Sequence, residues 1–184
     1  AGIIVQRGSF DVPSPHVIKI IGGEVYGNLD GILLKMSNDI EITGVHVYEN
    51  DREGIKIYGS RDVTITDSTI ENNSQSKPNG YAEIYLNPYV DSLTNSTFQV
   101  TDVTITGNTI GSTQSSYGIR EAVDVTGSHI EDNDFVGTFV RGETLTGPQV
   151  RVEMPDLVAP TDDFYFQIPH TAYVDIDAGD AVKL

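Results

Sequence analysis

The stretch VTITD at residues 63–67 returns almost unchanged as VTITG at residues 103–107, forty residues further along the chain. Similar runs begin at Ile40, 23 residues before Val63, and at Ile18, 22 residues before Ile40. The next copy is predicted at 123–127, after an interval of 20. Corners rich in asparagine follow most of these runs, at Asn28, Asn50, Asn72, Asn73 and Asn133. A repeat of this length is typical of a solenoid.

A second repeated element lies between the first ones, at residues 2–6, 31–35, 54–58, 82–86 and 118–122. Each copy is a short run rich in β-branched residues and bounded by Gly, Asn or Asp, which indicates a strand between turns. No window has the periodicity of a helix. The prediction is an all-β, single-stranded parallel β-helix with coils of about 20–23 residues and an insertion around 74–96. A β-sandwich is the alternative, although it does not explain aligned repeats.

Strand side chains alternate between two faces, so half of each run is expected to fill the coil and half to point outward. The inward set is Ile3, Val5, Ile32, Leu34, Ile55, Ile57 and Ile84. The outward set is Ile4, Gln6, Leu33, Lys35, Lys56, Tyr58, Glu83, Tyr85 and Arg120. Because rungs lie about 4.8 Å apart, the outward residues should form ladders along one face.

The chain has 184 residues, 27 acidic and 11 basic, and a formal charge of −16. This charge argues against a nucleic-acid surface. No apolar run is long enough to span a membrane, so no membrane partner is expected. There is no cysteine, which removes disulfides, thiolate nucleophiles and Cys-ligated metals from consideration.

Four of the few basic residues fall on or beside one predicted sheet. Together with the neighbouring polar and aromatic residues, the candidate substrate-binding set is Gln6, Arg7, Lys35, Lys56, Tyr58, Tyr85 and Arg120. Arg and Lys pair with carboxylates, and tyrosine rings offer apolar faces to sugars, so this set suits an acidic polysaccharide. The competing interpretation is that Lys and Tyr are ordinary solvent-facing strand residues.

Several motifs follow one another in order along the chain: GIIVQRG at 2–8, GILLKM at 31–36, EGIKIYG at 53–59 with Asp62 and Val63, GNTI at 107–110 and SYGI at 116–119. In order and spacing they resemble the catalytic A-module of secreted bacterial mannuronan (alginate) C5-epimerases, and this resemblance implies a right-handed, pectate-lyase-like β-helix. The resemblance covers about residues 2–135, the C-terminal half of such a module.

This resemblance implies that Lys35 lines the substrate groove, together with Gln6 and Arg7. The family's catalytic motif, Tyr-Gly-x-Asp-Pro-His-Glu, does not occur in the sequence. No catalytic residue is therefore predicted here: the parent protein would be an isomerase acting on poly-mannuronate, and this chain alone would be inactive. The family's Gly-Gly-x-Gly-x-Asp calcium repeat is also absent, so calcium is expected only for the full protein.

Other chemical candidates are weaker. His16, His46, His129 and His170 do not belong to the outward ladder, so they are interpreted as surface or turn residues. The oxygen-rich corner at 28–31 could bind calcium, but Asx corners are more often plain turns. No metal ligand and no cofactor is predicted in this chain.

The coils are predicted to occupy residues 1–142, and 143–184 to form a cap or the start of a further β-module. The chain opens on a full strand, so we expect it to continue missing N-terminal coils in a secreted or cell-surface protein. Two alternatives to the epimerase hypothesis stay open: a non-catalytic β-helix that binds an anionic polysaccharide or serves as a structural stalk, and part of a uronan lyase.

Overall fold

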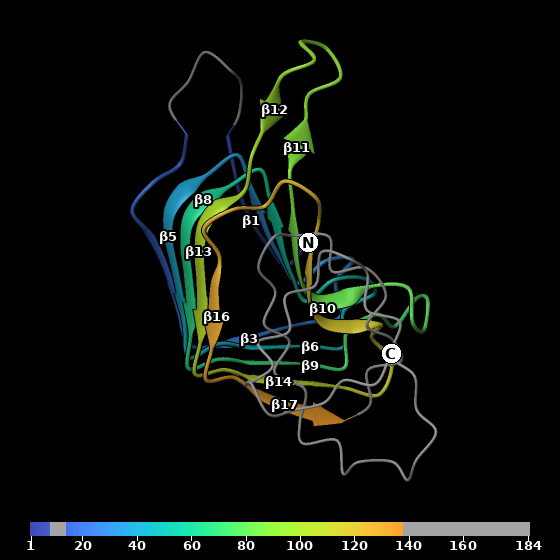
Figure 1. Cartoon of the computed structure of the whole chain (residues 1–184). Coiled ribbons are helices and arrows are strands. Elements are labelled where there is room, and N and C mark those ends of the chain that lie inside the picture. Colours follow the sequence, from blue (N-terminus) through green and yellow to red (C-terminus); the bar gives the residue numbers. More distant parts are fainter. Residues whose placement is uncertain (8–13, 138–184) are drawn as a thin grey trace, which may run out of the picture.

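The computed structural model describes residues 1–7 and 14–137, which wind into a parallel solenoid of three five-stranded sheets. Figure 1 shows the coils stacked so that each contributes one strand to each sheet. Sheet A consists of β1 (Ile3–Gln6), β4 (Ile32–Lys35), β7 (Ile55–Tyr58), β10 (Ala82–Asn87) and β15 (Tyr117–Glu121).

The other two sheets follow sheet A in every coil. Sheet B consists of β2 (Ile18–Ile21), β5 (Asn38–Thr43), β8 (Arg61–Thr66), β13 (Thr101–Thr106) and β16 (His129–Glu131). Sheet C consists of β3 (Glu24–Tyr26), β6 (His46–Tyr48), β9 (Thr69–Glu71), β14 (Thr109–Ser112) and β17 (Asp134–Gly137). Every pairing within these sheets is parallel, so the predicted β-helix is confirmed and the sandwich alternative is wrong.

The core is a set of aliphatic columns, because parallel pairing in register places like residues on successive rungs. Ile32 pairs with Ile55 and Ile55 with Ile84, and all three are fully buried. Sheet B contributes the equivalent column Ile42, Ile65 and Ile105. Burial of each such side chain stabilises the fold by about 1.5–3 kcal/mol. The inward positions expected from the alternation are therefore those that hold the coils together.

Two corners of the coil are held by ladders of polar side chains. Between sheets C and A, the side-chain oxygen of Asn50 accepts from the Asn28 N–H at 3.0 Å, and that of Asn73 accepts from the Asn50 N–H at 3.1 Å. Between sheets B and C, the Asn133 oxygen accepts from the Asn108 N–H at 3.1 Å. Asn133 thus belongs to a different corner from Asn28, Asn50 and Asn73, which corrects their grouping.

The last coil also departs from the predicted spacing. Residues 123–127 were expected to repeat 103–107, but β16 pairs instead, with Ile105 opposite Ile130. Thr126 makes an isolated bridge to Thr101. Register follows the buried Ile105 to Ile130 stack and the Asn108 to Asn133 ladder, which outweigh the local alternation at 123–125.

The forty-residue interval between Val63 and Val103 contains two excursions. A loop at 72–81 precedes β10, and an antiparallel hairpin of β11 (Tyr89–Val90) and β12 (Thr97–Phe98) follows it. In Figure 1 the hairpin projects beyond the coils at the end of sheet A. The predicted insertion around 74–96 covers most of both excursions, whereas the predicted boundary at 142 and the β-rich tail lie outside the described residues.

None of the described residues belongs to a helix that could cross a membrane.

Candidate functional site

The outward face of sheet A carries two columns of side chains. One column runs through Ile4, Leu33, Lys56, Tyr85 and Arg120. The other runs through Gln6, Lys35, Tyr58 and Asn87. Six predicted site residues therefore lie on one face as the two-residue period requires, and Arg7 follows directly after β1. We call Gln6, Lys35, Lys56, Tyr58, Tyr85, Asn87 and Arg120 the sheet A strip.

Cations and aromatic rings alternate along the strip. The Arg120 guanidinium lies 4.9 Å from the centre of the Tyr85 ring, and the Lys56 ammonium lies 5.7 Å from that ring on the next rung. Lys56 is also 5.5 Å from the Tyr58 ring. Each such contact contributes about 0.5–1 kcal/mol at an exposed site. The rings thereby orient the charged groups along the face.

The hairpin adds an aromatic wall beside the strip. The Tyr89 ring on β11 lies 4.2 Å from the Lys35 ammonium and makes an edge contact with Tyr58, with centroids 4.9 Å apart. Phe98 on β12 stacks behind Tyr89, 6.1 Å away. The sequence prediction missed Tyr89 because it lies in the interval that was set aside as an insertion. Its position two residues after an outward strand residue was the available signal.

Besides the two rings, Lys56 has an acidic partner, the buried carboxylate of Glu53. The Lys56 ammonium lies 3.7 Å from the Glu53 carboxylate, which is 4% exposed as a residue. Burial raises the pKa of Glu53, and the charge of Lys56 opposes that rise. Asp30, which is also buried, raises the pKa of Glu53 further through a side-chain hydrogen bond and its charge, so the two carboxyl groups form a buried pair. Glu53 therefore offsets part of the positive charge of Lys56, and Lys35 and Arg120 carry more of the strip's attraction for anions.

Glu83 was expected among the outward residues, and this expectation was wrong. Its side chain is fully buried at the corner between sheets C and A. The carboxylate accepts hydrogen bonds from the Asn73 N–H and side-chain amide and from the Ser115 hydroxyl. Burial raises its pKa, and these hydrogen bonds oppose the rise. Glu83 therefore continues the asparagine ladder instead of facing the strip.

The described histidines lie away from the strip, as expected. His46 on sheet C is 2.9 Å from the Glu71 carboxylate and stacks on Tyr48 at 4.3 Å. His129 on sheet B lies 2.8 Å from Glu131. His16 hydrogen-bonds the Ser14 carbonyl at 3.0 Å, and His170 lies outside the described residues.

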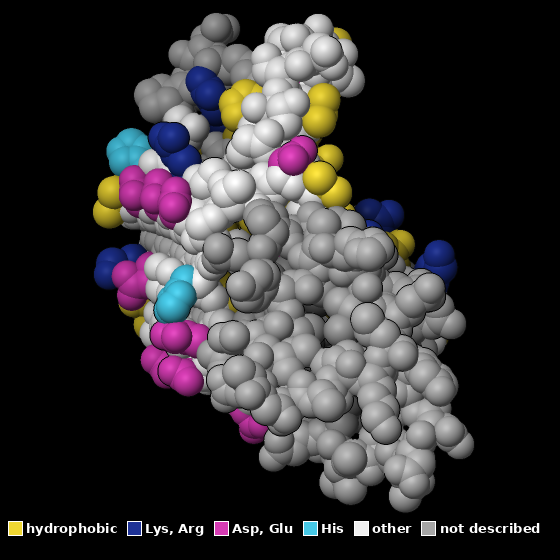
Figure 2. Space-filling view, in the orientation of Figure 1, with side chains coloured by type: hydrophobic (Ala, Val, Ile, Leu, Met, Phe, Trp, Pro, Cys, Tyr) yellow, Lys and Arg dark blue, Asp and Glu magenta, His cyan; other side chains and the backbone are white. Residues whose placement is uncertain are grey.

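Acidic side chains also lie outside the strip. Figure 2 shows magenta Asp and Glu groups gathered on the sheet B side of the view. Among residues 1–7 and 14–137, no group of three or more His, Cys, Asp or Glu side chains could hold a metal ion. The described strip presents cations and aromatic rings side by side on one face of sheet A.

Comparison with known proteins places this geometry in a family. A model of the right-handed β-helix region matches residues 5–149. The chain belongs to this family. It is 43% identical to the mannuronan C5-epimerase AlgE5 of Azotobacter vinelandii over 130 residues, which are 68% of this chain and 13% of that protein. It is 39% identical to alginate lyase 7 of the same organism over 125 residues, which are 65% of this chain and 14% of that protein.

A solved structure agrees with these sequence relatives. The A-module of the mannuronan C5-epimerase AlgE4 from A. vinelandii superposes with a TM-score of 0.69 at 34% identity, over 74% of this chain and 37% of that one. The predicted resemblance to the epimerase A-module is thereby confirmed as homology. The chain spans a small part of the curated relatives that it matches, so the homology covers a portion of a β-helix module.

Proposed function

We propose that this chain is the polysaccharide-binding part of a mannuronan C5-epimerase-like β-helix module that acts on poly-mannuronate. The observation that carries the proposal is the sheet A strip, in which Lys35, Lys56 and Arg120 alternate with Tyr58 and Tyr85 on one face. The homology to epimerases and the name of alginate lyase 7 support a uronan as the polymer.

The proposed role follows from what C5-epimerisation requires. The C6 carboxylate must be neutralised so that the C5 proton becomes acidic, and a base and an acid must then move protons at C5. Lys35, Arg120 and Arg7 supply cations for the first requirement. The described part of the strip offers no histidine for the second, and we assign Tyr58 and Tyr85 to lining the groove, so we propose that the proton-moving groups belong to other coils of the full protein.

Binding and chemistry are separated by one pair of measurements. Titration of this chain with poly-mannuronate should give binding that Lys35→Ala weakens at least about tenfold, since a charge-assisted hydrogen bond contributes about 1.5–3 kcal/mol. Proton NMR of the same mixture should show an unchanged polymer. An undiminished affinity of the Lys35→Ala variant would contradict the role of Lys35.

The second candidate is part of a uronan lyase on the same fold, favoured by the similarity to alginate lyase 7. NMR of the full protein with poly-mannuronate distinguishes the two, because epimerisation yields guluronate signals and lyase chemistry yields unsaturated chain ends. Location outside the cell and a calcium requirement of the full protein stay predictions.

A further inference from the structure

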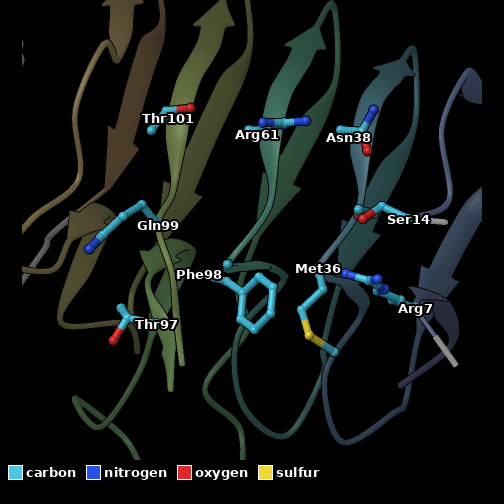
Figure 3. Close-up of a pocket in the computed structure, with 11 residues that line it drawn as sticks. Arg7, Ser14, Met36, Asn38, Arg61, Thr97, Phe98, Gln99 and Thr101 are labelled. Atoms are coloured by element: carbon cyan, nitrogen blue, oxygen red, sulfur yellow. The ribbon is translucent and has the colours of Figure 1, made fainter. Parts of the chain in front are cut away.

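A pocket of about 340 Å³ opens beside the strip, at the corner where the strands of sheet A end and those of sheet B begin (Figure 3). Arg7, Met36 and Gly59 line it, and each directly follows the last residue of a sheet A strand. Its volume is near the lower end of small-ligand sites and suits one sugar residue. The pocket therefore continues the surface of the strip past the ends of β1, β4 and β7.

The opposite side of the pocket comes from sheet B and the hairpin. Asn38, Arg61 and Thr101 stand at equivalent register positions at the start of β5, β8 and β13. Figure 3 shows these three side chains in a row, with the Phe98 ring of β12 and the Met36 side chain also at the pocket. The connections between sheet A and sheet B of four successive coils thus contribute to one concave surface.

The lining has the composition of a site for an anionic sugar. It includes the guanidinium groups of Arg7 and Arg61, the amides of Asn38 and Gln99, and several hydroxyl groups, but no carboxylate. Such a lining is notable in a chain with 27 acidic and 11 basic residues. Guanidinium groups bind carboxylates through paired N–H donors, and Phe98 offers an apolar ring beside them.

Arg61 can turn toward a ligand at little cost. Its side chain is 66% exposed, and its contact with the Asp62 carboxylate is 3.8 Å long. Exposed ion pairs of this kind contribute about 0–1 kcal/mol. A ligand carboxylate held in the pocket would therefore compete easily with Asp62 for the guanidinium.

We infer that this pocket binds one uronate residue of the polymer whose neighbouring residues lie over the sheet A strip, with Arg61 and Arg7 on its carboxylate and Phe98 beside its ring. This inference rests on the proposed function, because it assigns the pocket to the same polymer. It adds a subsite that only a chain long enough to cover the strip and pass its edge can reach.

The test uses mannuronate oligomers from about two to about eight residues long, titrated calorimetrically into the full chain. Arg61→Gln should weaken binding of the longest oligomers about tenfold, the loss expected for one charge-assisted contact, and leave the shortest unchanged. Lys19→Gln is the control: it removes one positive charge from a pair with Glu41 on sheet B and should change neither. Ring-proton NMR signals of Phe98 should shift with long oligomers alone.

Equal affinity of Arg61→Gln and the unchanged chain for every length would overturn the pocket assignment. An equal loss at every length, matched by Lys19→Gln, would also overturn it, because that pattern reports net charge. A different result would contradict the proposed function: neither the chain nor any variant would bind an oligomer of any length. Binding that Lys35→Ala weakens but Arg61→Gln does not would leave the strip in place and remove the pocket.

Discussion

Glu83 places a carboxylate at the end of the column of amides formed by Asn28, Asn50 and Asn73. Its partners are all donors: the Asn73 backbone N–H, the Asn73 side-chain amide and the Ser115 hydroxyl. The carboxylate thus closes the ladder by accepting from the Asn73 backbone N–H, whose hydrogen bonds both go to Glu83, whereas the Asn73 side-chain amide also donates to two backbone carbonyls. Ser115 also reaches the Asn73 carbonyl at 3.3 Å, so the corner acts as one network.

Substitutions at Glu83 should therefore show how much of its contribution to stability comes from hydrogen bonding and how much from its charge. Glu83→Leu should lower the free energy of unfolding by about 1–3 kcal/mol, because it leaves the Asn73 backbone N–H buried without its Glu83 acceptor. Glu83→Gln should cost less, since its amide can donate to the Ser115 hydroxyl while its oxygen accepts from Asn73. Urea unfolding at neutral pH followed by circular dichroism measures both, and equal losses for the two variants would contradict this role.

The pH dependence of stability follows from the same residue. Burial raises the pKa of Glu83, so the folded chain holds this proton more tightly than the unfolded chain. Its contribution is fully present below the unfolded pKa and is lost as pH rises through the raised folded pKa. Burial shifts the pKa of Glu53 and Glu121 in the same direction. Unfolding measured between about pH 4 and pH 8 should show Glu83→Gln losing less stability with rising pH than the unchanged chain.

Residue placement was predictable wherever the period of two continues. The alternation predicts the wrong position for the Glu83 side chain, because the register position just before Ile32, Ile55 and Ile84 faces the corner and not the outward face. Gly31 and Gly54 occupy this position in two other coils, and a Cβ on Gly54 would lie 2.6 Å from the Asn73 amide nitrogen. The two glycines indicate that this position is crowded in their coils. In β10 the position is occupied by Glu83, whose long side chain reaches Asn73.

At the scale of elements, the hairpin β11–β12 is fixed at its base and at its turn. Gly59 (φ 63°) lies under the base, where a Cβ would meet the Cβ atoms of Tyr89 and Phe98 at 2.7 and 2.9 Å. In the turn, the Asp91 carboxylate accepts from the N–H groups of Thr94 and Leu93 at 2.7 and 3.0 Å. Both contacts hold Tyr89 in place beside Lys35.

A fixed Tyr89 should contribute to binding through Lys35. Tyr89→Leu should weaken binding of poly-mannuronate about threefold to tenfold, because it removes the ring that orients the Lys35 ammonium. Tyr89→Phe keeps the ring and should bind as the unchanged chain does. Leu93→Ser, at the 92% exposed tip, is the control for the hairpin itself. Equal affinities for Tyr89→Leu and Tyr89→Phe would show that the ring does not act on Lys35.

Most strands of sheets A and B were predictable because their β-branched alternation repeats with little change. The hairpin was not, since Tyr89 and Phe98 belong to a single coil and no repeat reveals their pairing. The final coil was misplaced for a related reason: Val123 and Val125 imitate the local pattern, but the register depends on Ile130 stacking on Ile105. In such cases the contacts between coils, and not the local alternation, determine which strands pair and in which register.

At the scale of the whole molecule, a basic strip lies on a chain of formal charge −16. The contacts of the strip and the net charge of the chain act over different distances. Contacts of Lys35 and Arg120 with a bound carboxylate act within a few ångströms, whereas the net charge repels a polyuronate during its approach. The Debye length falls from about 30 Å at 10 mM salt to about 10 Å at 100 mM, so salt screens the approach before it weakens the contacts.

Salt should therefore act on the two binding rates differently. Between about 10 and 100 mM salt, the association rate constant for poly-mannuronate should rise, because the long-range repulsion is screened. The dissociation rate constant should rise as well, since the exposed contacts of the strip weaken. Surface plasmon resonance with immobilised polymer measures both constants.

Lys35→Ala should raise the dissociation rate constant at every salt concentration. It should change the salt dependence of association little, because one charge alters the total from −16 to about −17. An association rate that falls steadily over this range would mean that the local field of the strip, and not the net charge, governs the approach of the polymer.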